Sequence, residues 1–532
     1  MKHIIVTSGP IGVGKSLFSA EIEKRPKVKR VSTRKHILEA TKCENERGAL
    51  QRAGDKLDVE SDGKWVADAV ENAINNDSSV EIFLVDSARI ESQVSELRNR
   101  FGGAVFHIHL TAADEELERR YKLRKQELKE YPTYQEAASH GTERGVKDLA
   151  SVADLCLNTD HVDAESLATA ALAWRGLSSK PYDPEQLVDV IVGGQYGSEG
   201  KGNVCAAIAT DYAALVRIGG PNAGHKVAVP EYTFVQLPSG TGSTPDAEIM
   251  IGAGSTISLP KLLKEILDQK LEGERLSIDP RAMIINDWDR EIEQKGLQKI
   301  STTGQGVGAA SSRKILNRDN ETFGPAVRLA GEVSELKEYV RNVRLRIEKI
   351  LERGGRILIE GTQGTMLSIH HGLYPHVTSR ETSVAGCLSE AGIAPARLNR
   401  AIMVVRTYPI RVGGTSGWIG QEIEFEELSN RSGIPIDELR KTETGSVSYK
   451  QRRVAEFDWG QLRHSVILNG ATEIAITFAD YFGIENRAAT TYSELNEGTQ
   501  DFVQKVERVA GVPVTLISKA FAIDSVIKRE NV

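Results

Sequence analysis

The first third of the chain alternates short apolar runs with a segment of helical spacing. Apolar runs cover residues 2–7, 82–85 and 104–110, and residues 17–22 have the spacing of an amphipathic helix. Short apolar runs bounded by turn residues are typical of strands that are buried on both faces, as in parallel sheets. The order of strand, helix and strand therefore predicts an α/β domain.

A second series of the same kind begins at residue 188. The apolar run 188–193 leads into a glycine-rich loop, after which we expect a helix to open at about Val204. Another buried strand is predicted at residues 357–360, again followed directly by a glycine. This second series therefore predicts a further α/β domain.

The boundary between the two series falls at residues 177–184, where two prolines stand among polar turn residues. A chain of 532 residues also exceeds what one ordinary hydrophobic core organises. We therefore predict the fold class α/β with two αβ domains, at residues 1–178 and 187–532, each built on a mainly parallel sheet.

Composition and charge narrow the class of protein. With 40% hydrophobic and 27% charged residues, the chain fits a soluble globular protein. A net charge of −7 argues against direct nucleic-acid binding, which usually needs a basic excess. The four cysteines lack paired spacing, which is typical of reduced thiols in a cytoplasmic protein. No apolar window has the length of a membrane span, and the apolar N-terminal run is too short for a signal peptide.

A Walker A loop follows the first predicted strand, with the sequence Gly9-Pro10-Ile11-Gly12-Val13-Gly14-Lys15-Ser16. Its glycines let backbone N–H groups converge on an anion at a helix N-terminus. Lys15 is expected to reach the β- and γ-phosphates of a nucleoside triphosphate, and Ser16 a magnesium ion. Asp86, which follows the second strand, either holds this metal through water or is a helix cap or turn residue.

A second glycine loop, of a different kind, stands in the middle of the chain. Its sequence is Gly194-Gln195-Tyr196-Gly197-Ser198-Glu199-Gly200-Lys201-Gly202-Asn203, and it does not satisfy the Walker A pattern. A strand, a glycine loop and a helix in this order again suit a phosphate, to which Lys201 adds a point charge. The chain therefore carries two predicted phosphate sites.

The first domain resembles the P-loop nucleoside and nucleotide kinases in the order of its elements. Residues 51–58 look like part of the segment with which that family binds its acceptor. The resemblance implies that Arg34 is a ligand of the acceptor phosphate. It also implies that Arg120 or Arg124, on the predicted basic helix 114–129, is a lid residue. Ordinary surface arginines are the alternative interpretation of all three.

Several separated motifs of the second domain resemble the adenylosuccinate synthetase family, in that family's order. They are residues 194–203, 219–225, 301–308, 361–365 with 371–379, and 444–453. That family phosphorylates the 6-oxygen of a purine nucleotide and then replaces this phosphate with the amine of aspartate. The resemblance implies a carbon–nitrogen ligase that uses Mg²⁺, a nucleoside triphosphate, a purine nucleoside monophosphate and L-aspartate. It also implies a homodimer that lends Arg318 or Arg313 across its interface.

By this resemblance, each motif contributes residues to the site. Catalysis is assigned to Ser198, Lys201, His225 and Gln363, with Lys201 stabilising the transferred phosphoryl group and His225 serving the 6-oxygen. Nucleotide and phosphate binding is assigned to Gly197, Gly200, Gly202, Asn222, Thr302, Thr303, Thr378, Asp480 and Ser518. Aspartate binding is assigned to Ser446, Ser448, Lys450 and Arg452. The carbonyl of Gly224 and the hydroxyl of Ser198 are the expected magnesium ligands in this domain.

Ser198 stands where the family has an aspartate that takes the N1 proton of the acceptor and binds magnesium. A serine hydroxyl is a weaker base and a poorer metal ligand. One interpretation is an acceptor with a 2-amino group, as in the phage-type branch that acts on dGMP. A second is a site that no longer catalyses synthesis and acts as a nucleotide sensor or in defence. A third is an ordinary IMP-dependent enzyme in which Glu199 or a water supplies the base.

Two further departures concern the donor and the amino acid. Phe478 replaces the lysine that covers a guanine base, and Ser518 is all that remains of a loop that packs on the same base, although Asp480 is kept. ATP or dATP therefore fits at least as well as GTP. Lys450 replaces an arginine by a point charge, which weakens the match to aspartate. We adopt dGMP or GMP as the predicted acceptor, and a nucleoside or nucleoside monophosphate as the substrate of the first domain.

Overall fold

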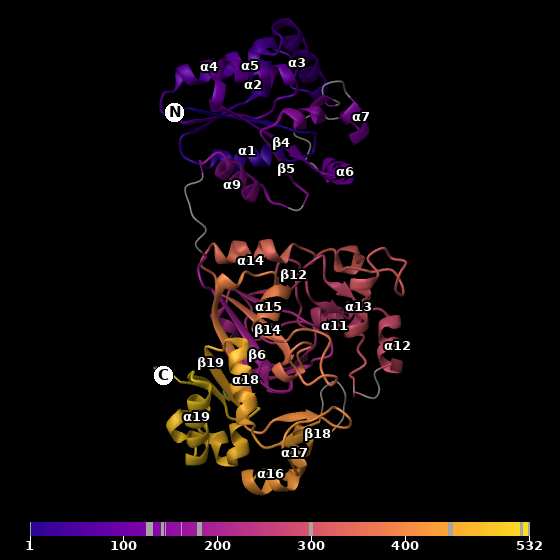
Figure 1. Ribbon diagram of the computed structural model, residues 1–532, viewed down its shortest axis with the longest axis vertical. Coiled ribbons are helices and arrows are strands. Elements are labelled where there is room, and N and C mark those ends of the chain that lie inside the picture. Colours follow the sequence, from indigo (N-terminus) through magenta and orange to yellow (C-terminus); the bar gives the residue numbers. More distant parts are fainter. Residues whose placement is uncertain are drawn as a thin grey trace. The chain divides into compact units, whose positions relative to one another are not determined.

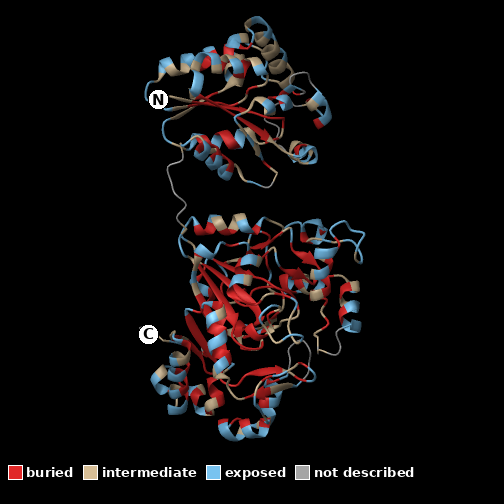
Figure 2. Ribbon diagram, viewed as in Figure 1, coloured by how far each residue is buried: buried red, intermediate tan, exposed pale blue. Residues whose placement is uncertain are grey.

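The computed structural model describes residues 2–123, 131–139, 143, 145–160, 162–177, 184–296, 300, 302–444, 451–521 and 525–529. The chain divides into two compact units, Met1–Tyr182 and Asp183–Val532, inside the proline-containing segment. Each unit has its own sheet (Figure 1), and in each the buried residues concentrate on the strands (Figure 2). Within the described ranges, no helix is both long enough and apolar enough to cross a membrane.

The described residues of the N-terminal unit form a parallel sheet of five strands in the order β2-β3-β1-β4-β5. Ile5 belongs to one core and its neighbours Ile4 and Val6 to the other, as expected for a strand buried on both faces. The strands are β1 (His3–Ser8), β2 (Val28–Val31), β3 (Ile82–Val85), β4 (Val105–Thr111) and β5 (Leu155–Asn158).

Two helix layers cover this sheet. α1 (Lys15–Glu23) and α9 (Ala164–Trp174) pack together over one core, and α4 (Lys64–Asn76) and α5 (Glu91–Phe101) pack together over the other. The other helices of this unit with printed bounds are α2 (Thr33–Thr41), α3 (Arg47–Ser61), α6 (Asp114–Leu123) and α7 (Tyr134–Ser139). The α/β prediction for this unit is confirmed.

The described residues of the C-terminal unit form a sheet of nine strands in the order β12-β10-β7-β14-β6-β15-β19-β20-β21. All pairs are parallel except β20 with β21. The strands are β6 (Val188–Gly193), β7 (Ala214–Arg217), β10 (Glu248–Ile251), β12 (Leu276–Ile278), β14 (Ile357–Gly364), β15 (Leu398–Arg406), β19 (Glu473–Thr477), β20 (Val514–Ser518) and β21 (Val526–Lys528).

Three small sheets stand beside this large one in the described ranges: β8-β9, β11-β13 and β16-β18-β17. Their strands are β8 (His225–Ala228), β9 (Glu231–Phe234), β11 (Thr256–Ile257), β13 (Met283–Ile284), β16 (Ile410–Val412), β17 (Glu422–Ile423) and β18 (Arg452–Ala455). The helices are α10 (Lys201–Ile208), α11 (Leu259–Asp268), α12 (Asp287–Gly296), α13 (Val307–Leu316), α14 (Val343–Leu351), α15 (Val384–Ala391), α16 (Phe425–Ser432), α17 (Ile436–Thr442), α18 (Trp459–Asn469) and α19 (Glu497–Ala510).

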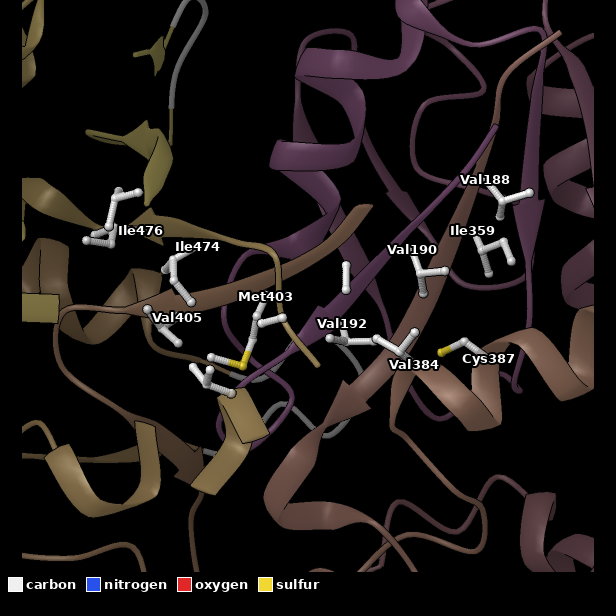
Figure 3. Close-up of a cluster of buried hydrophobic side chains, with 14 of the residues drawn as sticks. Val188, Val190, Val192, Ile359, Val384, Cys387, Met403, Val405, Ile474 and Ile476 are labelled. Carbon is white, nitrogen blue, oxygen red and sulfur yellow. The ribbon is translucent and has the colours of Figure 1, made fainter. Parts of the chain in front are cut away.

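The large sheet separates two cores. On one face, side chains of β6, β14, β15 and β19 pack against α14, α15, α18 and α19, and Figure 3 shows part of this cluster around Val190, Val192, Met403 and Cys387. On the other face, Ile191 and its neighbours pack against α10 and α11. Helices on both faces of a parallel sheet leave the carboxyl edge of the strands free for a site.

Two boundaries differ from the predicted ones. The helix after the second glycine loop begins at Lys201, three residues before the expected start, because Gly200 has a φ of 83° and forms the N-cap. Strand β14 continues past Glu360 to Gly364, with a register irregularity against β6. This extension carries Gln363 to the carboxyl edge of the sheet.

Asp189, the second residue of β6, has a fully buried carboxylate. Its Oδ2 accepts hydrogen bonds from Tyr212 at 2.7 Å, Arg400 Nη2 at 2.8 Å and Arg356 Nη2 at 2.6 Å, and its Oδ1 accepts one from Asn399 at 2.9 Å. Burial alone would raise its pKa, but the bonds from Arg400 and Tyr212 hold the pKa of Asp189 below its usual value. This carboxylate therefore ties β6 to β15.

Asp189→Ala is expected to lower the free energy of unfolding by about 1–3 kcal/mol, because the buried hydroxyl of Tyr212 loses its acceptor and two partly exposed arginines lose their carboxylate. Chemical denaturation followed by circular dichroism measures the change. Because the folded pKa is depressed, the stabilisation is present above the unfolded pKa of about 3.9 and is lost as the pH falls through the folded value. The gap between the two proteins should therefore narrow below about pH 4.

The matched control is Asp211→Ala, which removes a half-exposed pair with Lys528 at 3.6 Å. Such a pair contributes about 0–1 kcal/mol. If Asp189→Ala unfolded at the same denaturant concentration as this control, the structural role assigned to Asp189 would be wrong.

Candidate active sites

The predicted site residues of the C-terminal unit come from the carboxyl ends of parallel strands. Ser198 and Lys201 follow β6, Asn222 and His225 follow β7, Gln363 ends β14, Asp480 follows β19 and Ser518 ends β20. In open α/β sheets, this edge is where ligands bind. Topology therefore places on one edge residues that are up to several hundred positions apart in sequence.

The second glycine loop folds around a carboxylate of its own. Oε1 of Glu199 accepts the backbone N–H groups of Gln195 at 3.0 Å and Gly197 at 2.7 Å, and Oε2 lies 2.6 Å from the ammonium group of Lys201. Glu199 and Lys201 are each 1% exposed. One interpretation of Ser198 was that Glu199 supplies the base in its place. The carboxylate of Glu199 is already engaged in these bonds.

The ring of His225 is fixed by contacts at its Nδ1 atom. Its Nδ1 contacts the carboxylate of Glu360 and lies 2.7 Å from Arg217 Nη1, while Glu360 Oε2 accepts the backbone N–H of Ser239 at 2.7 Å. The other ring nitrogen, Nε2, is buried and has no hydrogen-bond partner among the described residues. Burial and the charge of Arg217 lower the pKa of His225 to about 4.

The approach of α10 to β8 depends on a glycine. A Cβ at Gly202 would lie 2.9 Å from the Cβ of His225. The first turn of α10, which holds Lys201, and the first residue of β8 therefore pack backbone against side chain. This contact brings the predicted phosphate-binding lysine and the predicted catalytic histidine to the same place.

Three predicted acceptor-binding residues meet in a polar cluster. Gln363 Nε2 donates to Asn222 Oδ1 at 2.8 Å, and Asn222 Nδ2 donates to Thr378 Oγ1 at 3.4 Å. Thr362 holds the other amide atom of Gln363 with a bond of 2.8 Å. Gln363 has a φ of 59°, a conformation that non-glycine residues adopt at a cost and that is concentrated at functional sites.

A buried arginine connects Ser198 to the end of the predicted aspartate loop. Arg406 Nη1 donates to the carbonyl of Ser198 at 3.2 Å, and its Nη2 pairs with Glu443 at 2.5 Å. Arg452 Nη1 reaches the same carboxylate at 3.3 Å. Burial would raise the pKa of Glu443, but Arg406 and Arg452 hold it below its usual value. Ser446, Ser448 and Lys450 lie outside the described residues.

Asp480, which is predicted to contact the donor base, has a hydrogen-bond partner for only one of its carboxylate oxygens among the described residues. Asp480 Oδ2 accepts from Arg487 Nε at 2.9 Å, whereas its buried Oδ1 has no partner within the described ranges. Burial raises the pKa of Asp480 to about 6 against the charge of Arg487. The ring of Phe478 carries the guanidinium of Arg406 at 3.7 Å from its centroid, and the hydroxyl of Ser518 donates to Ala520 O at 3.3 Å.

The loop around Thr302 and Thr303 precedes α13, whose first amides are already occupied. Glu293 accepts the backbone N–H groups of Gly306 at 2.7 Å and Gly308 at 2.5 Å. The Thr302 hydroxyl accepts from Gly304 N at 3.2 Å. A phosphate at this loop would therefore meet threonine hydroxyls rather than the first helical amides.

One of the two predicted interface arginines is excluded. Arg313 is fully buried and pairs with Asp289 at 2.7 Å, and it also donates to Ala326 O at 2.7 Å. A side chain that is held inside its own subunit cannot be lent to a partner, so this alternative was wrong. Arg318 is exposed and stays a prediction.

The Walker A loop of the N-terminal unit has the expected backbone. Gly14 has a φ of 97° and caps α1, which begins at Lys15, and the ammonium of Lys15 donates to Pro10 O at 3.0 Å. Asp86 accepts the backbone N–H and the hydroxyl of Thr33, both at 3.0 Å. Because Thr33 is the first residue of α2, Asp86 accepts the first backbone N–H of that helix, whose N-cap is Ser32, and its role in holding the metal through water stays a prediction.

A cavity of about 1170 Å³ opens on this loop. It is lined by Ser16, Arg34, Asp86 and Arg120, among others. Arg34 donates to Asn45 Oδ1 at 2.9 Å, and Arg120 pairs with Glu116 at 2.7 Å and donates to Thr159 O at 2.7 Å. Arg124 lies outside the described residues.

Several residues of these sites were not found from the sequence. Arg217 ends β7, Glu360 follows the apolar start of β14, and Arg406 and Glu443 pair across 37 positions of sequence. A charged residue at the end of an apolar run is the signal that was present, because such a charge must find a partner inside the protein.

Comparison with known proteins identifies the C-terminal unit. The family model "Adenylosuccinate synthetase" matches residues 190–324 and 325–486. The adenylosuccinate synthetase of Methanocaldococcus jannaschii is 36% identical over 352 residues, which cover 64% of this chain and 96% of that protein. The enzyme of Pyrococcus horikoshii is 33% identical over 353 residues, which cover 64% of this chain and 98% of that protein.

Two solved structures are similar over the same part. Fully ligated adenylosuccinate synthetase from Plasmodium falciparum aligns with a TM-score of 0.56 at 22% identity and covers 65% of this chain and 100% of its own, which shows the fold. Succinoaminodeoxyadenylate synthetase of cyanophage S-2L, bound to dGMP and dATP, aligns with a TM-score of 0.52 at 28% identity over 65% of this chain and 95% of its own. Since the family model spans more than half of the residues, the chain belongs to the adenylosuccinate synthetase family.

Proposed function

We propose that the C-terminal unit condenses dGMP or GMP with L-aspartate at the expense of a nucleoside triphosphate. The observation that carries this proposal is Ser198 at the place of the family's aspartate, beside an otherwise assembled set of Lys201, His225, Asn222 and Gln363. A serine hydroxyl is small and accepts a hydrogen bond, which suits the 2-amino group of guanine. The similarity to a cyanophage enzyme bound to dGMP supports the same acceptor.

His225 serves the 6-oxygen in this proposal. With a pKa of about 4 it is neutral in the empty site at pH 7, with Nδ1–H directed at Glu360 and Nε2 open to the substrate. An arriving phosphoryl dianion favours the protonated ring, which then donates from Nε2. The γ-phosphoryl group passes to the 6-oxygen, and the aspartate amine then bonds to C6 as phosphate leaves.

In this proposal, Lys201 contacts both Glu199 and the γ-phosphate. Its ammonium is paired with Glu199 and points at the loop whose amides surround that carboxylate. A γ-phosphate beside the loop shares the lysine with Glu199 and meets a charge that is already oriented. Preorganised charge of this kind stabilises a transferred phosphoryl group without reorganisation at the moment of reaction.

Magnesium is compatible with the donors present. Within the described ranges, no group of three or more His, Cys, Asp and Glu side chains is placed to hold a metal. The Gly224 carbonyl and the Ser198 hydroxyl are oxygen donors, the type that Mg²⁺ prefers together with substrate phosphates. When bound, the ion would neutralise charge on the triphosphate.

The amino acid site is proposed around Arg452, with Ser446, Ser448 and Lys450 as the other contributors. Glu443 pairs with both Arg452 and the buried Arg406. The guanidinium of Arg452, which is expected to bind a substrate carboxylate, is therefore fixed by the buried carboxylate of Glu443. The enzyme is proposed to act as a cytoplasmic homodimer with Arg318 at the interface.

For the N-terminal unit, we propose phosphoryl transfer to a nucleoside or nucleoside monophosphate. The Walker A loop with Lys15 and Ser16 faces a cavity that also contains Arg34 and Arg120. A triphosphate on the loop and an acceptor beside Arg34 would share this one space. Ser16 is the proposed magnesium ligand.

Given dGMP, L-aspartate, ATP and Mg²⁺, the protein is expected to release phosphate and form a succinylated 2-aminopurine nucleotide, which mass spectrometry identifies. His225→Ala should lower kcat by about 10²–10⁴-fold, because general acid–base assistance is lost. His464→Ala, at an exposed position of α18, is the matched control. Absence of phosphate release with every acceptor would favour a nucleotide sensor, and a higher kcat/KM with IMP than with dGMP would overturn the acceptor.

ATP or dATP is expected to exceed GTP in kcat/KM by at least about tenfold, a difference of 1.4 kcal/mol. The unpartnered Oδ1 of Asp480 would accept the adenine amino group in its charged form. Because the pKa of Asp480 is raised to about 6, the carboxylate is neutralised as the pH falls below 6, and KM for ATP should rise there.

Asp480→Asn should raise KM for ATP at pH 7 and remove this pH dependence, while Asp501→Asn on the exposed side of α19 should change neither. GTP as the better donor, or an unchanged pH profile in Asp480→Asn, would contradict the assignment. Initial rates between pH 5 and 8 provide the measurement.

Lys15→Ala is expected to abolish formation of a phosphorylated nucleotide by the N-terminal unit, because the triphosphate loses its β/γ-phosphate contact. Aspartate condensation should stay within about twofold, since that reaction uses Lys201. Lys24→Ala, which removes a surface pair with Glu21, is the control. Loss of both activities in Lys15→Ala would mean that the two sites are coupled.

A further inference from the structure

The cavity of the N-terminal unit, which the Walker A loop lines, has a second wall formed by one face of α3. Along α3, residues Arg47, Gln51, Gly54 and Asp58 recur at helical spacing and all line the cavity. One face of this helix is therefore turned to the space that the Walker A loop opens on.

Asp58 is fixed at the end of this face of α3 by two buried side chains. Its Oδ1 accepts from Trp65 Nε1 at 2.6 Å and from Gln93 Nε2 at 2.8 Å. Gln93 is itself held, because its Oε1 accepts the backbone N–H of Arg89 at 2.8 Å. Trp65 and Gln93 are 6% and 2% exposed. The carboxylate of Asp58 therefore has one orientation, and among the described residues its Oδ2 makes no hydrogen bond or ion pair.

The same wall offers apolar surface and a cation. Ile37 and Leu50 are half-buried and line the cavity. Three other arginines on the cavity are paired with carboxylates: Arg30 with Asp86, Arg89 with Glu143 and Arg120 with Glu116. Arg34 is bonded to the neutral side chain of Asn45 and forms no ion pair among the described residues.

We propose that this wall binds a nucleoside monophosphate, with Oδ2 of Asp58 accepting an N–H or amino hydrogen of the base and Arg34 binding the phosphate. Ile37 and Leu50 supply apolar surface for the ring. The inference rests on the proposed kinase activity and narrows its acceptor. An unphosphorylated sugar or nucleoside leaves Arg34 without an anion, and a sugar phosphate has no base to cover the apolar surface of Ile37 and Leu50.

The step balances without another reactant. A phosphate oxygen of the monophosphate forms a bond to the γ-phosphorus, and the bond from that phosphorus to the β,γ-bridging oxygen breaks, which gives two nucleoside diphosphates. Asp58 is a positioning and specificity residue in this step and takes no proton. The ligase site consumes a nucleoside monophosphate, so the two units act on the same chemical class.

Asp58→Asn tests the assignment sharply, because the amide must turn its oxygen toward the Trp65 and Gln93 donors. Its NH₂ group then faces the cavity, and an acceptor is replaced by a donor of the same size. We expect KM for a monophosphate with an amino-bearing base, such as dGMP or dAMP, to rise at least about tenfold, the 1.4 kcal/mol of one bond. KM for ATP should be unchanged within about twofold.

The assay uses the full-length protein without aspartate and separates nucleoside diphosphate products by chromatography. The acceptors are dGMP, dAMP, deoxyguanosine and deoxyribose 5-phosphate, and only the two monophosphates should be efficient. Glu60→Gln, an exposed position two residues further along α3, is the matched control. An unchanged KM for ATP in the kinase reaction shows that the N-terminal unit of each variant is folded.

Two outcomes overturn the inference alone: wild-type transfer that is equally efficient to deoxyguanosine or deoxyribose 5-phosphate, and an Asp58→Asn variant with unchanged KM for dGMP and dAMP. Absence of product from every acceptor with the wild-type protein overturns the proposed kinase activity together with the inference.

Discussion

The ion pair between Glu199 and Lys201 governs how the carboxyl edge of the large sheet is built. A carboxylate and an ammonium group, both almost fully buried, are stable only because the loop amides complete the shell around the carboxylate. The loop therefore keeps its shape without a phosphate. Lys201 is also fixed at the start of α10 by the Gly200 cap. The cost of ordering these groups is met on folding rather than on binding, which is the condition for electrostatic preorganisation.

The two predicted phosphate loops have the same kind of backbone conformation before the lysine, but they differ in what the lysine contacts. In both, a glycine with φ above 80° precedes the lysine that begins the helix, namely Gly14 before Lys15 and Gly200 before Lys201. Lys15 then donates to carbonyls of its own loop, whereas Lys201 meets a carboxylate. The carboxylate that meets Lys201 comes from the glycine loop itself, two positions before the lysine.

Local patterns sufficed for strands β1, β3, β4 and β6, for the start of β14 and for the two glycine loops, because each depends on neighbours in sequence. The partners of the charged residues did not follow from the sequence. Glu360 reaches His225 across 135 positions, and only the order of the strands in the sheet brings them together. Arg313 was assigned to the interface from a resemblance that aligns loosely. Nothing in the sequence indicated that this arginine is buried in a pair with Asp289. The start of α10 was missed because the cap, rather than the apolar pattern, sets it.

One buried arginine contacts both Ser198 and Phe478, the two positions that were predicted to depart from the family pattern. Arg406 donates to the carbonyl of Ser198 and lies flat on the ring of Phe478. A lysine at position 478 would place a second cation against this buried guanidinium, which a single carboxylate, Glu443, already balances. An aromatic ring removes that repulsion and adds a cation–π contact of about 0.5–2 kcal/mol. Arg406 therefore connects the backbone of the second glycine loop to the ring at position 478, and because the bond at Ser198 uses the main-chain carbonyl, it does not depend on the side chain at that position.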